Sequence, residues 1–431
     1  MLTDRRFLPP GPKGHWLGGN TFEYDRDRMG FLMRCHDEYG DVFAYDKRTI
    51  VVRDPDLVHS LLTRTNEDFS SESSPVATSF DADRSATDSQ LWMAARRSGW
   101  RGLNQDAAAA HTGRLRQLFD RQLNGTVGRE VDVLALMETY SGHAAADFCL
   151  GADANGIAEV VVENTRAIAP LSGSSEVLPE WFPSRTLKRF RQARKKTLDV
   201  LSGKIAARKS AAAPENPRDL LDVLLTIRPG LSEIQVQRLI RGILLAAYGV
   251  PAASMAWTLW TLTTRPALWA MVEAEAMAWG SEEEPALTEL PRTEAVVKET
   301  LRLWPPTWLM GRTALRATAL GKWSLAPETQ IMFSPYLMHR DSRWWPDPDT
   351  AVPDRWLNGG KPIHKYAYIP FGAGPRVCLG TRLGLTQLVL TMYWLTRNYR
   401  VVAPDALAVM PVFHNLLAPY GFQATFVRKC G

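Results

Sequence analysis

The segment Phe371–Gly380 combines a cysteine with residue types that could keep its sulfur ionised. Its sequence is FGAGPRVCLG, and a helical pattern starts directly after Cys378. The positive end of a helix dipole and converging amide groups stabilise a thiolate, and Gly372 and Gly374 allow the backbone to approach closely. Arg376 offers a cation to an anionic group of a cofactor. A lone cysteine is usually a buried structural thiol, but these neighbours favour a thiolate that binds a metal.

A second group of charged residues lies upstream, in the sequence KETLR at residues 298–302. On a helix, Glu299 and Arg302 share one face and can form an ion pair. An ordinary surface pair is the simplest interpretation, and such a pair contributes little to stability. The Pro305-Pro306 step that ends this helix and the later sequence PDRW, which contains Arg355, make the combination more specific.

The order of these motifs resembles the cytochrome P450 family. The family's haem-ligand pattern FxxGxRxCxG is matched at Phe371, Gly374, Arg376, Cys378 and Gly380. The sequences PPGPKG, GDVFAY and RDPD near the start, and TQIMFSPYLMHRD at residues 329–341, extend the resemblance over almost the whole chain. It implies the cytochrome P450 fold, which is mainly α with small β-sheets (α+β), with haem between a long distal helix and the cysteine loop.

The resemblance also implies roles for individual residues. Haem b would be bound through its iron by Cys378, with Phe371, Gly372, Gly374, Arg376 and Gly380 around it and Ala247 on the distal side. A structural triad of Glu299, Arg302 and Arg355 would brace the haem-binding coil.

Cations near the haem propionates are implied as well. Arg312 stands where the family often places one. A further one is expected on a helix near His111, because family members tend to carry His or Trp four residues before an Arg. The sequence LRQLF aligns best with Arg116, which puts Thr112 rather than His111 at the partner position. The alternative is an amphipathic helix with exposed arginines.

The distal helix is expected within Leu244–Thr264. No residue from Gly242 to Thr264 is charged, a length that would nominate a membrane span. The proline, serine and four threonines in this stretch favour a helix that is buried all round, so no membrane span is predicted.

This helix departs from the family pattern. Members that hydroxylate substrates usually carry a small pair followed by an acid and a threonine, which relay protons. Aligned by the end of the helix, Ala246 and Ala247 occupy the small pair, Gly249 the acid and Val250 the threonine, so both relay groups are missing. Pro251 either kinks the helix near Ala247 or is tolerated. Protons could come from substrate or water, peroxide could replace oxygen, or the reaction could need no relay.

The resemblance places a substrate pocket above the haem. Its predicted residues are Ala246, Ala247, Val250, Thr307, Trp308, Leu309, Leu416 and Leu417. Most of them are apolar, which suits a terpenoid, an aromatic or an indole-like metabolite. Trp308 could stack on a substrate ring or belong to the core.

The elements that must position these residues change along the chain. Residues 40–63 predict a small β-rich region in which Asp54-Pro55 opens a helix, and from Arg114 onward helices dominate. The break at residues 211–217 is a loop between helices or a domain hinge. The basic stretch Arg185–Lys209 favours a solvated helix face over nucleic-acid binding, because it lacks interleaved aromatic residues beyond Phe190. A single domain over residues 1–431 without a fused reductase is expected.

Composition limits the function further. The 431 residues carry 51 Lys and Arg against 46 Asp and Glu, a net charge of +5 that is too small to indicate nucleic acid. Four separated cysteines and a charged, proline-containing N-terminus favour a reducing cytoplasm. The leading hypothesis is a monooxygenase that uses O2 and electrons from a ferredoxin and ferredoxin reductase to oxidise a small apolar metabolite in natural-product biosynthesis. The alternatives are coupling, cyclisation or rearrangement without oxygen insertion, and a haem-binding carrier or sensor.

Overall fold

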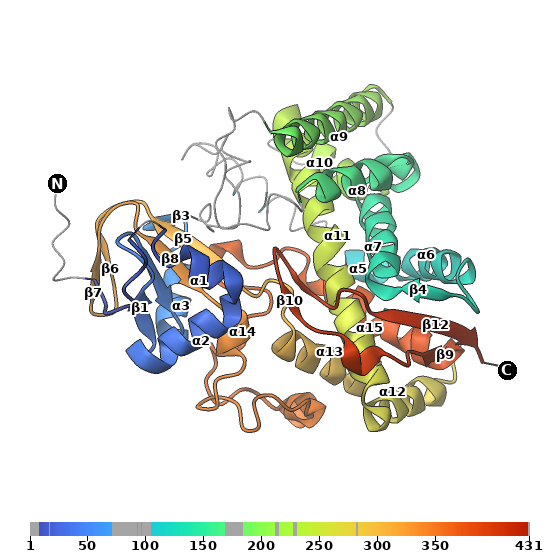
Figure 1. Cartoon of the computed structure of the whole chain (residues 1–431). Coiled ribbons are helices and arrows are strands. Elements are labelled where there is room, and N and C mark those ends of the chain that lie inside the picture. The colour runs from blue at the N-terminus through green and yellow to red at the C-terminus, as the bar shows by residue number, and fades with distance from the viewer. Residues whose placement is uncertain are drawn as a thin grey trace.

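The computed structural model of the chain describes residues 8–16, 18–70, 93, 96, 105–168, 184–211, 215–226, 231–281 and 283–429. Within these ranges, a β-rich part built from an early and a late segment of the sequence lies beside a larger helical part (Figure 1). The prediction of a mainly helical fold with small sheets is confirmed.

The β-rich part contains a five-stranded sheet in the order β1-β2-β8-β5-β3. Its elements are α1 (Thr21–Arg26), α2 (Arg28–Tyr39), β1 (Val42–Ala44), β2 (Thr49–Val52), α3 (Pro55–Thr63), β3 (Phe69–Ser70), β5 (Met310–Ala314), β8 (Gln330–Phe333) and α14 (Pro335–Met338). The helix predicted at Asp54-Pro55 is present, because the Asp54 side chain accepts the Leu57 amide and Pro55 occupies the first turn.

Early and late parts of the chain meet in this sheet. Strand β2 pairs with β8 in parallel, with Ile50 opposite Ile331, while β8 pairs with β5 in antiparallel orientation. Both isoleucines are fully buried. The sheet therefore fixes β5, which carries Arg312, against the N-terminal region.

The remaining elements form the helical part and three small sheets. The helices are α5 (Gln105–Ala110), α6 (Thr112–Asn124), α7 (Val133–Leu150), α8 (Ile157–Ile168), α9 (Arg185–Ser210), α10 (Leu220–Thr226), α11 (Glu233–Thr263), α12 (Pro266–Ala278), α13 (Pro291–Leu303) and α15 (Thr381–Asn398). The short 3-10 turns are η4 (Gly151–Ala154), η6 (Leu287–Glu289), η7 (Pro353–Gly359), η8 (Gly374–Arg376) and η9 (Ala406–Ala408). The strands are β4 (Glu130–Asp132), β6 (Thr318–Leu320), β7 (Trp323–Leu325), β9 (Tyr399–Val402), β10 (Val412–Phe413), β11 (Leu417–Ala418) and β12 (Gln423–Arg428).

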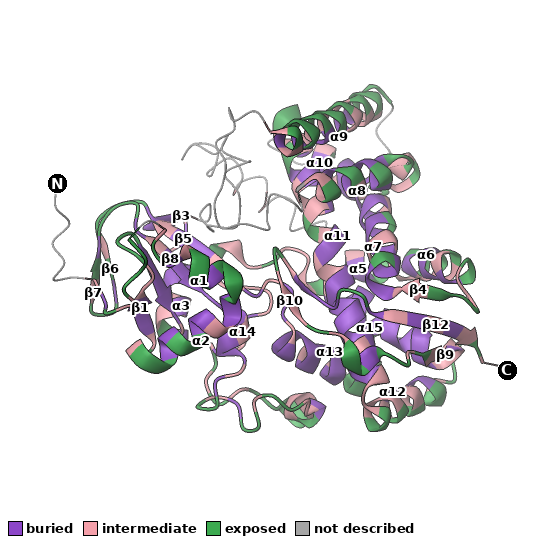
Figure 2. Ribbon diagram, in the orientation of Figure 1, coloured by how far each residue is buried: buried purple, intermediate pink, exposed green. Residues whose placement is uncertain are grey.

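Helix α11 runs through the centre of the helical part and packs against α7 and α15 (Figures 1 and 2). It begins at Glu233, eleven positions before the predicted Leu244, because Ser232 and Gln235 form a capping box there. The helix continues through Pro251 to Thr263 without a break.

Among the described helices, α11 is long and apolar enough to cross a membrane, because a stretch of 18 of its residues has a mean hydropathy of 1.5. Of this stretch, 61% is buried inside the protein. A helix in the core of a large protein meets the same criterion.

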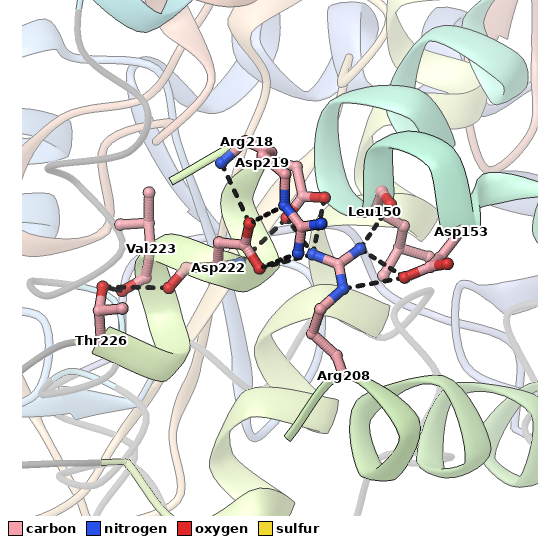
Figure 3. A network of polar contacts seen from close by, with 8 residues as sticks. All are labelled: Leu150, Asp153, Arg208, Arg218, Asp219, Asp222, Val223 and Thr226. Carbon is pink, nitrogen blue, oxygen red and sulfur yellow. Dashed lines mark hydrogen bonds and ion pairs between the residues drawn. The ribbon is translucent and has the colours of Figure 1, made fainter. Parts of the chain in front are cut away.

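The basic helix α9 has one buried arginine at its C-terminal end. Leu187, Phe190 and Leu201 are buried, whereas most of the basic residues are exposed, which agrees with the predicted solvated face. Arg208 instead points inward, where its side chain is 6% exposed and hydrogen-bonds three carboxylates (Figure 3). The three acids are Asp153, Asp219 and Asp222.

This arginine joins three elements. Asp153 belongs to η4, Asp222 belongs to α10, and the carbonyl of Leu150, at the end of α7, accepts a further bond from Arg208 at 3.0 Å. Burial acts to raise the pKa of Asp222, but bonds from Arg218 and Arg208 outweigh it and lower that pKa to about 2. The end of α9 is therefore fixed by ionised groups.

Candidate active site

The cysteine loop is held in a compact turn before α15. The Cys378 amide donates to the Phe371 carbonyl at 2.8 Å, and the Thr381 hydroxyl donates to the Cys378 carbonyl at 2.8 Å. Helix α15 begins at Thr381, slightly later than the predicted start directly after the cysteine. The sulfur therefore lies just before a helix N-terminus, with Gly380 at the capping position.

Two glycines in this loop have backbone conformations that side chains rarely adopt. Gly372 and Gly374 have φ values of 69° and 68°. A Cβ atom on Gly374 would lie 2.2 Å from the Leu62 carbonyl oxygen of α3. The loop can therefore approach α3 this closely only with glycine at position 374.

Cys378 differs from the other described cysteines because its side chain is exposed, whereas Cys35 and Cys149 are buried. Desolvation by the surrounding loop raises the pKa of the Cys378 thiol. The Gly380 amide, the Arg96 guanidinium and the Thr381 hydroxyl all act in the opposite direction. An accessible sulfur with these donors suits a metal ligand.

Two of the predicted propionate ligands are neighbours. Arg312 is 5% exposed, and its Nε donates to the Thr65 hydroxyl at 3.0 Å. Arg376 lies in η8, where its Nε donates to the Asn66 side-chain oxygen at 3.1 Å. Burial, followed by the positive charge of Arg376, lowers the pKa of Arg312 to about 10. Two adjacent guanidinium groups favour an anionic ligand beside them.

The other two predicted propionate ligands have different partners. Arg116 donates to Asp120 at 2.8 Å and lies 3.6 Å from Glu284. His111 lies 3.1 Å from Asp147, a residue of α7. The structure therefore gives both side chains carboxylate partners, Arg116 on its own helix and His111 on α7.

Arg96 reaches the cysteine loop instead, and the sequence analysis missed it. Its guanidinium donates to the Val377 carbonyl, and its charge acts on the Cys378 thiol. The sequence did contain a signal, since Trp92 precedes Arg96 by the four residues that the family favours. The sequence LRQLF had instead placed this cation at Arg116.

The predicted triad is a buried network around Glu299. Arg302 donates to both Glu299 oxygens at 2.9 and 3.0 Å, and Arg355 donates to Oε1 at 3.4 Å. The Val352 amide and the Trp356 indole add bonds of 2.8 and 2.9 Å. Since Glu299 is 1% and Arg302 0% exposed, this pair is isolated from water.

The network extends to the cysteine loop through a neutral histidine. Arg302 donates to the carbonyls of His339, Pro348 and Thr350 at 2.6 to 3.0 Å. The His339 Nε2 accepts the Ile369 amide at 2.9 Å, so its Nδ1 carries the proton that faces the Arg302 carbonyl at 3.2 Å. Burial, followed by the charge of Arg302, lowers the pKa of His339 to about 3.

One stripe of α11 is accessible where the distal site is expected. Between residues 246 and 259, Ala246 is exposed, Ala247, Val250 and Pro251 are half-buried, and every other residue is buried. These four residues share one helix face. Ala247 packs against the same apolar cluster as Leu379, which follows the cysteine.

Gly249, at the position of the missing acid, faces the C-terminal loop. A Cβ atom on Gly249 would lie 2.9 Å from Cδ1 of Leu416. The absence of a side chain at this position therefore allows Leu416 to pack directly on α11.

The predicted pocket residues differ in burial. Trp308 is 1% exposed and donates from its indole to the His414 carbonyl at 2.7 Å, so it belongs to the core. Leu417 is also buried, and its amide donates to the Pro306 carbonyl at 2.9 Å. The half-buried members are Ala247, Val250, Thr307, Leu309 and Leu416. A cavity of about 720 Å³ lies elsewhere, between α7, α8 and α9.

Comparison with known proteins decides the family. A family profile described as cytochrome P450 matches residues 9–426. The chain belongs to the cytochrome P450 family. Cytochromes P450 are haem-dependent oxidoreductases that use O2 and redox partners on small substrates.

Several known proteins are similar to the chain over part or all of its length. Cyclooctatin synthase of Streptomyces melanosporofaciens is 33% identical over 40% of this chain and 38% of its own length. The cyclooctat-9-en-7-ol 5-monooxygenase of the same organism is 28% identical over 55% and 52%. The crystal structure of the cytochrome P450DA heme domain superposes with a TM-score of 0.81 at 19% identity, covering 99% of this chain and 98% of that one, which supports the fold.

The described residues fit a haem. An accessible sulfur at Cys378, a loop whose glycine at position 374 has no room for a side chain, and the adjacent cations Arg312 and Arg376 supply a metal ligand and partners for two carboxylates. The accessible stripe of α11 has apolar side chains, which suit the other face of a porphyrin.

Proposed function

We propose that this cytochrome P450 binds haem b through Cys378 and oxidises a small apolar metabolite of the terpenoid or indole-like class in natural-product biosynthesis. The observation that carries the proposal is the accessible sulfur of Cys378 in a loop bounded by cations and braced by a buried network. A non-covalent haem b is favoured because the sequence contains no C-x-x-C-H motif for covalent attachment.

The residues of the chain would have distinct roles around the cofactor. Cys378 would bind the iron, and Arg96, Arg312 and Arg376 would hold the propionates. The Glu299 network would keep the cysteine loop rigid. When bound, haem supplies oxygen activation, and a thiolate ligand favours cleavage of the O–O bond.

The substrate class is supported by the distal stripe. Ala246, Ala247, Val250 and Pro251 contribute apolar side chains to it, and Leu416 packs nearby. Such walls bind hydrophobic molecules and exclude water. The similarity to two Streptomyces enzymes named for cyclooctatin and cyclooctat-9-en-7-ol supports a cyclic terpenoid over an indole.

The protons for the reaction would come from water or substrate. Gly249 and Val250 occupy the positions of the usual acid and threonine. The side chain of Leu416 occupies the space beside Gly249. The nearest hydroxyl in the sequence of α11, that of Tyr248, is bonded to Glu138 of α7 at 3.1 Å. Burial and the neighbouring charge of Glu138 raise the pKa of Tyr248, so it remains protonated.

Electrons would come from a cytoplasmic ferredoxin and its reductase. Lys361, Lys365 and Arg382 flank the cysteine loop in sequence and are exposed. An acidic ferredoxin would be attracted by such cations, and the rate of its association would fall with salt.

The carbon-monoxide difference spectrum of the reduced protein tests this proposal. We expect a strongly red-shifted Soret band in the wild type and none in Cys378→Ser. The buried Cys35 offers a matched control, because Cys35→Ala should keep the band. A wild type without the band would refute the assignment of Cys378.

Labelled dioxygen separates the enzymatic alternatives. Monooxygenation places the label in the product, whereas coupling, cyclisation or rearrangement does not. A haem-loaded protein that consumes no reduced nicotinamide with any electron donor and any apolar metabolite would be a carrier or sensor. The complete set of residues around Cys378 favours turnover over that function.

A further inference from the structure

The accessible stripe of α11 lacks polar side chains, so its backbone decides its polarity. The four residues of the stripe are Ala246, Ala247, Val250 and Pro251. In a regular helix each carbonyl accepts the amide four residues later, which leaves little polarity at the surface. A polar atom is therefore expected on this stripe only where that pattern is interrupted.

Pro251 interrupts the pattern at one carbonyl. Proline has no N–H group, so the carbonyl of Ala247 loses the donor that a residue at position 251 would normally supply. The neighbouring carbonyls have donors. In the helical pattern the Ala246 carbonyl accepts the amide of Val250, four residues later, and the Val250 carbonyl accepts the Ser254 hydroxyl at 2.9 Å. The Ala247 carbonyl is thus the acceptor on the stripe whose regular donor is missing.

We propose that the Ala247 carbonyl accepts a hydrogen bond from a hydroxyl group of the substrate, so that the protein selects an apolar cyclic alcohol. This inference rests on the proposed function, because it requires the stripe to face the substrate. The apolar surroundings strengthen such a bond and make an unbonded carbonyl costly. The same bond fixes one edge of the substrate against α11, which orients the rest of the molecule.

The test measures how strongly the protein prefers an alcohol donor. The dissociation constants of cyclododecanol and of cyclododecyl methyl ether are measured with haem-loaded protein, by absorbance titration and by equilibrium dialysis. The preference is the ether constant divided by the alcohol constant. Pro251→Ala restores the helical N–H, and we expect it to lower the preference about fivefold, or roughly 1 kcal/mol.

A matched control separates the hydrogen bond from pocket shape. Leu416→Ala removes part of the apolar wall, so it should change both dissociation constants together and leave the preference unchanged. Pro251→Ala should fold, because alanine removes the clash that proline makes inside a helix. Pro251→Gly restores the same N–H and provides a second variant.

The outcomes distinguish this inference from the proposed function. A wild type without the red-shifted carbon-monoxide band refutes the proposed function. A haem-loaded wild type whose preference is unchanged by Pro251→Ala or Pro251→Gly refutes the alcohol site alone. In the wild type itself, an alcohol that binds no more tightly than its ether also overturns the inference, whatever the variants do.

Discussion

Replacement of Glu299 by glutamine should be among the most damaging conservative changes in the protein. Oε1 accepts from Arg302, Arg355 and the Val352 amide, and Oε2 accepts from Arg302 and the Trp356 indole. An amide in either orientation would place its NH2 group against at least two donors. Since Arg302 is fully buried, its charge would also lose its partner. Loss of one member of a buried pair costs about 3–5 kcal/mol.

The assay is denaturant unfolding of the haem-loaded protein, followed by tryptophan fluorescence and circular dichroism. Glu294 lies on the same helix and provides the control, because its side chain is 26% exposed and pairs only with Lys298 at 2.9 Å among its described contacts. Glu294→Gln should change the free energy of unfolding by less than about 1 kcal/mol. If Glu299→Gln also stays within about 1 kcal/mol of the wild type, the network does not stabilise the fold as argued.

Three further predictions concern the histidine, the distal contact and the cations. The folded-state pKa of His339 is about 3 against an ordinary 6.5, so its contribution to stability is present above pH 6.5 and is lost as the pH falls toward 3. His339→Gln keeps an acceptor but does not titrate. As the pH falls through that window, the free energy of unfolding of this variant should decrease by about 1.4 kcal/mol per pH unit less than that of the wild type. Equal pH dependence in the two proteins would contradict this. Gly249→Ala should displace the Leu416 side chain and change the order of ligand affinities with little loss of stability, and Leu416→Ala in the same chain should cancel the effect; independent effects in a double-mutant cycle would exclude the contact. Arg312→Ala should speed haem transfer to apomyoglobin more than the exposed control Arg316→Ala, and equal rates would argue against a propionate role.

The cysteine loop and the buried triad could be predicted because their chemistry is local and their motifs are specific. Glycine is the residue type that tolerates the φ of 68° at Gly374, and Glu299 and Arg302 are one helical turn apart. The cap at Asp54-Pro55 was equally readable, since a helix start depends on neighbouring residues.

Tertiary contacts could not be predicted in the same way. From the sequence alone, Trp308 could contact the substrate or belong to the core. Its indole donates a hydrogen bond to the His414 carbonyl, which places it in the core. Arg116 and Arg96 are both arginines near the expected helix, and only the packing of that region determines which one reaches Val377. The uncharged run marks only the apolar part of α11, whereas the helix itself begins earlier, at the capping box of Ser232 and Gln235.

The pairing of β2 with β8 has a consequence for synthesis of the chain. Residues 53–329 lie between the two strands. Strand β4 likewise pairs with β12, which is near the C-terminus and is synthesised much later. A nascent chain that has left the ribosome up to residue 300 therefore holds unpaired strand edges and an apolar α11 without α15 against it. Because closing such long loops is slow, maturation should depend on chaperones or slow translation until the last hundred residues emerge.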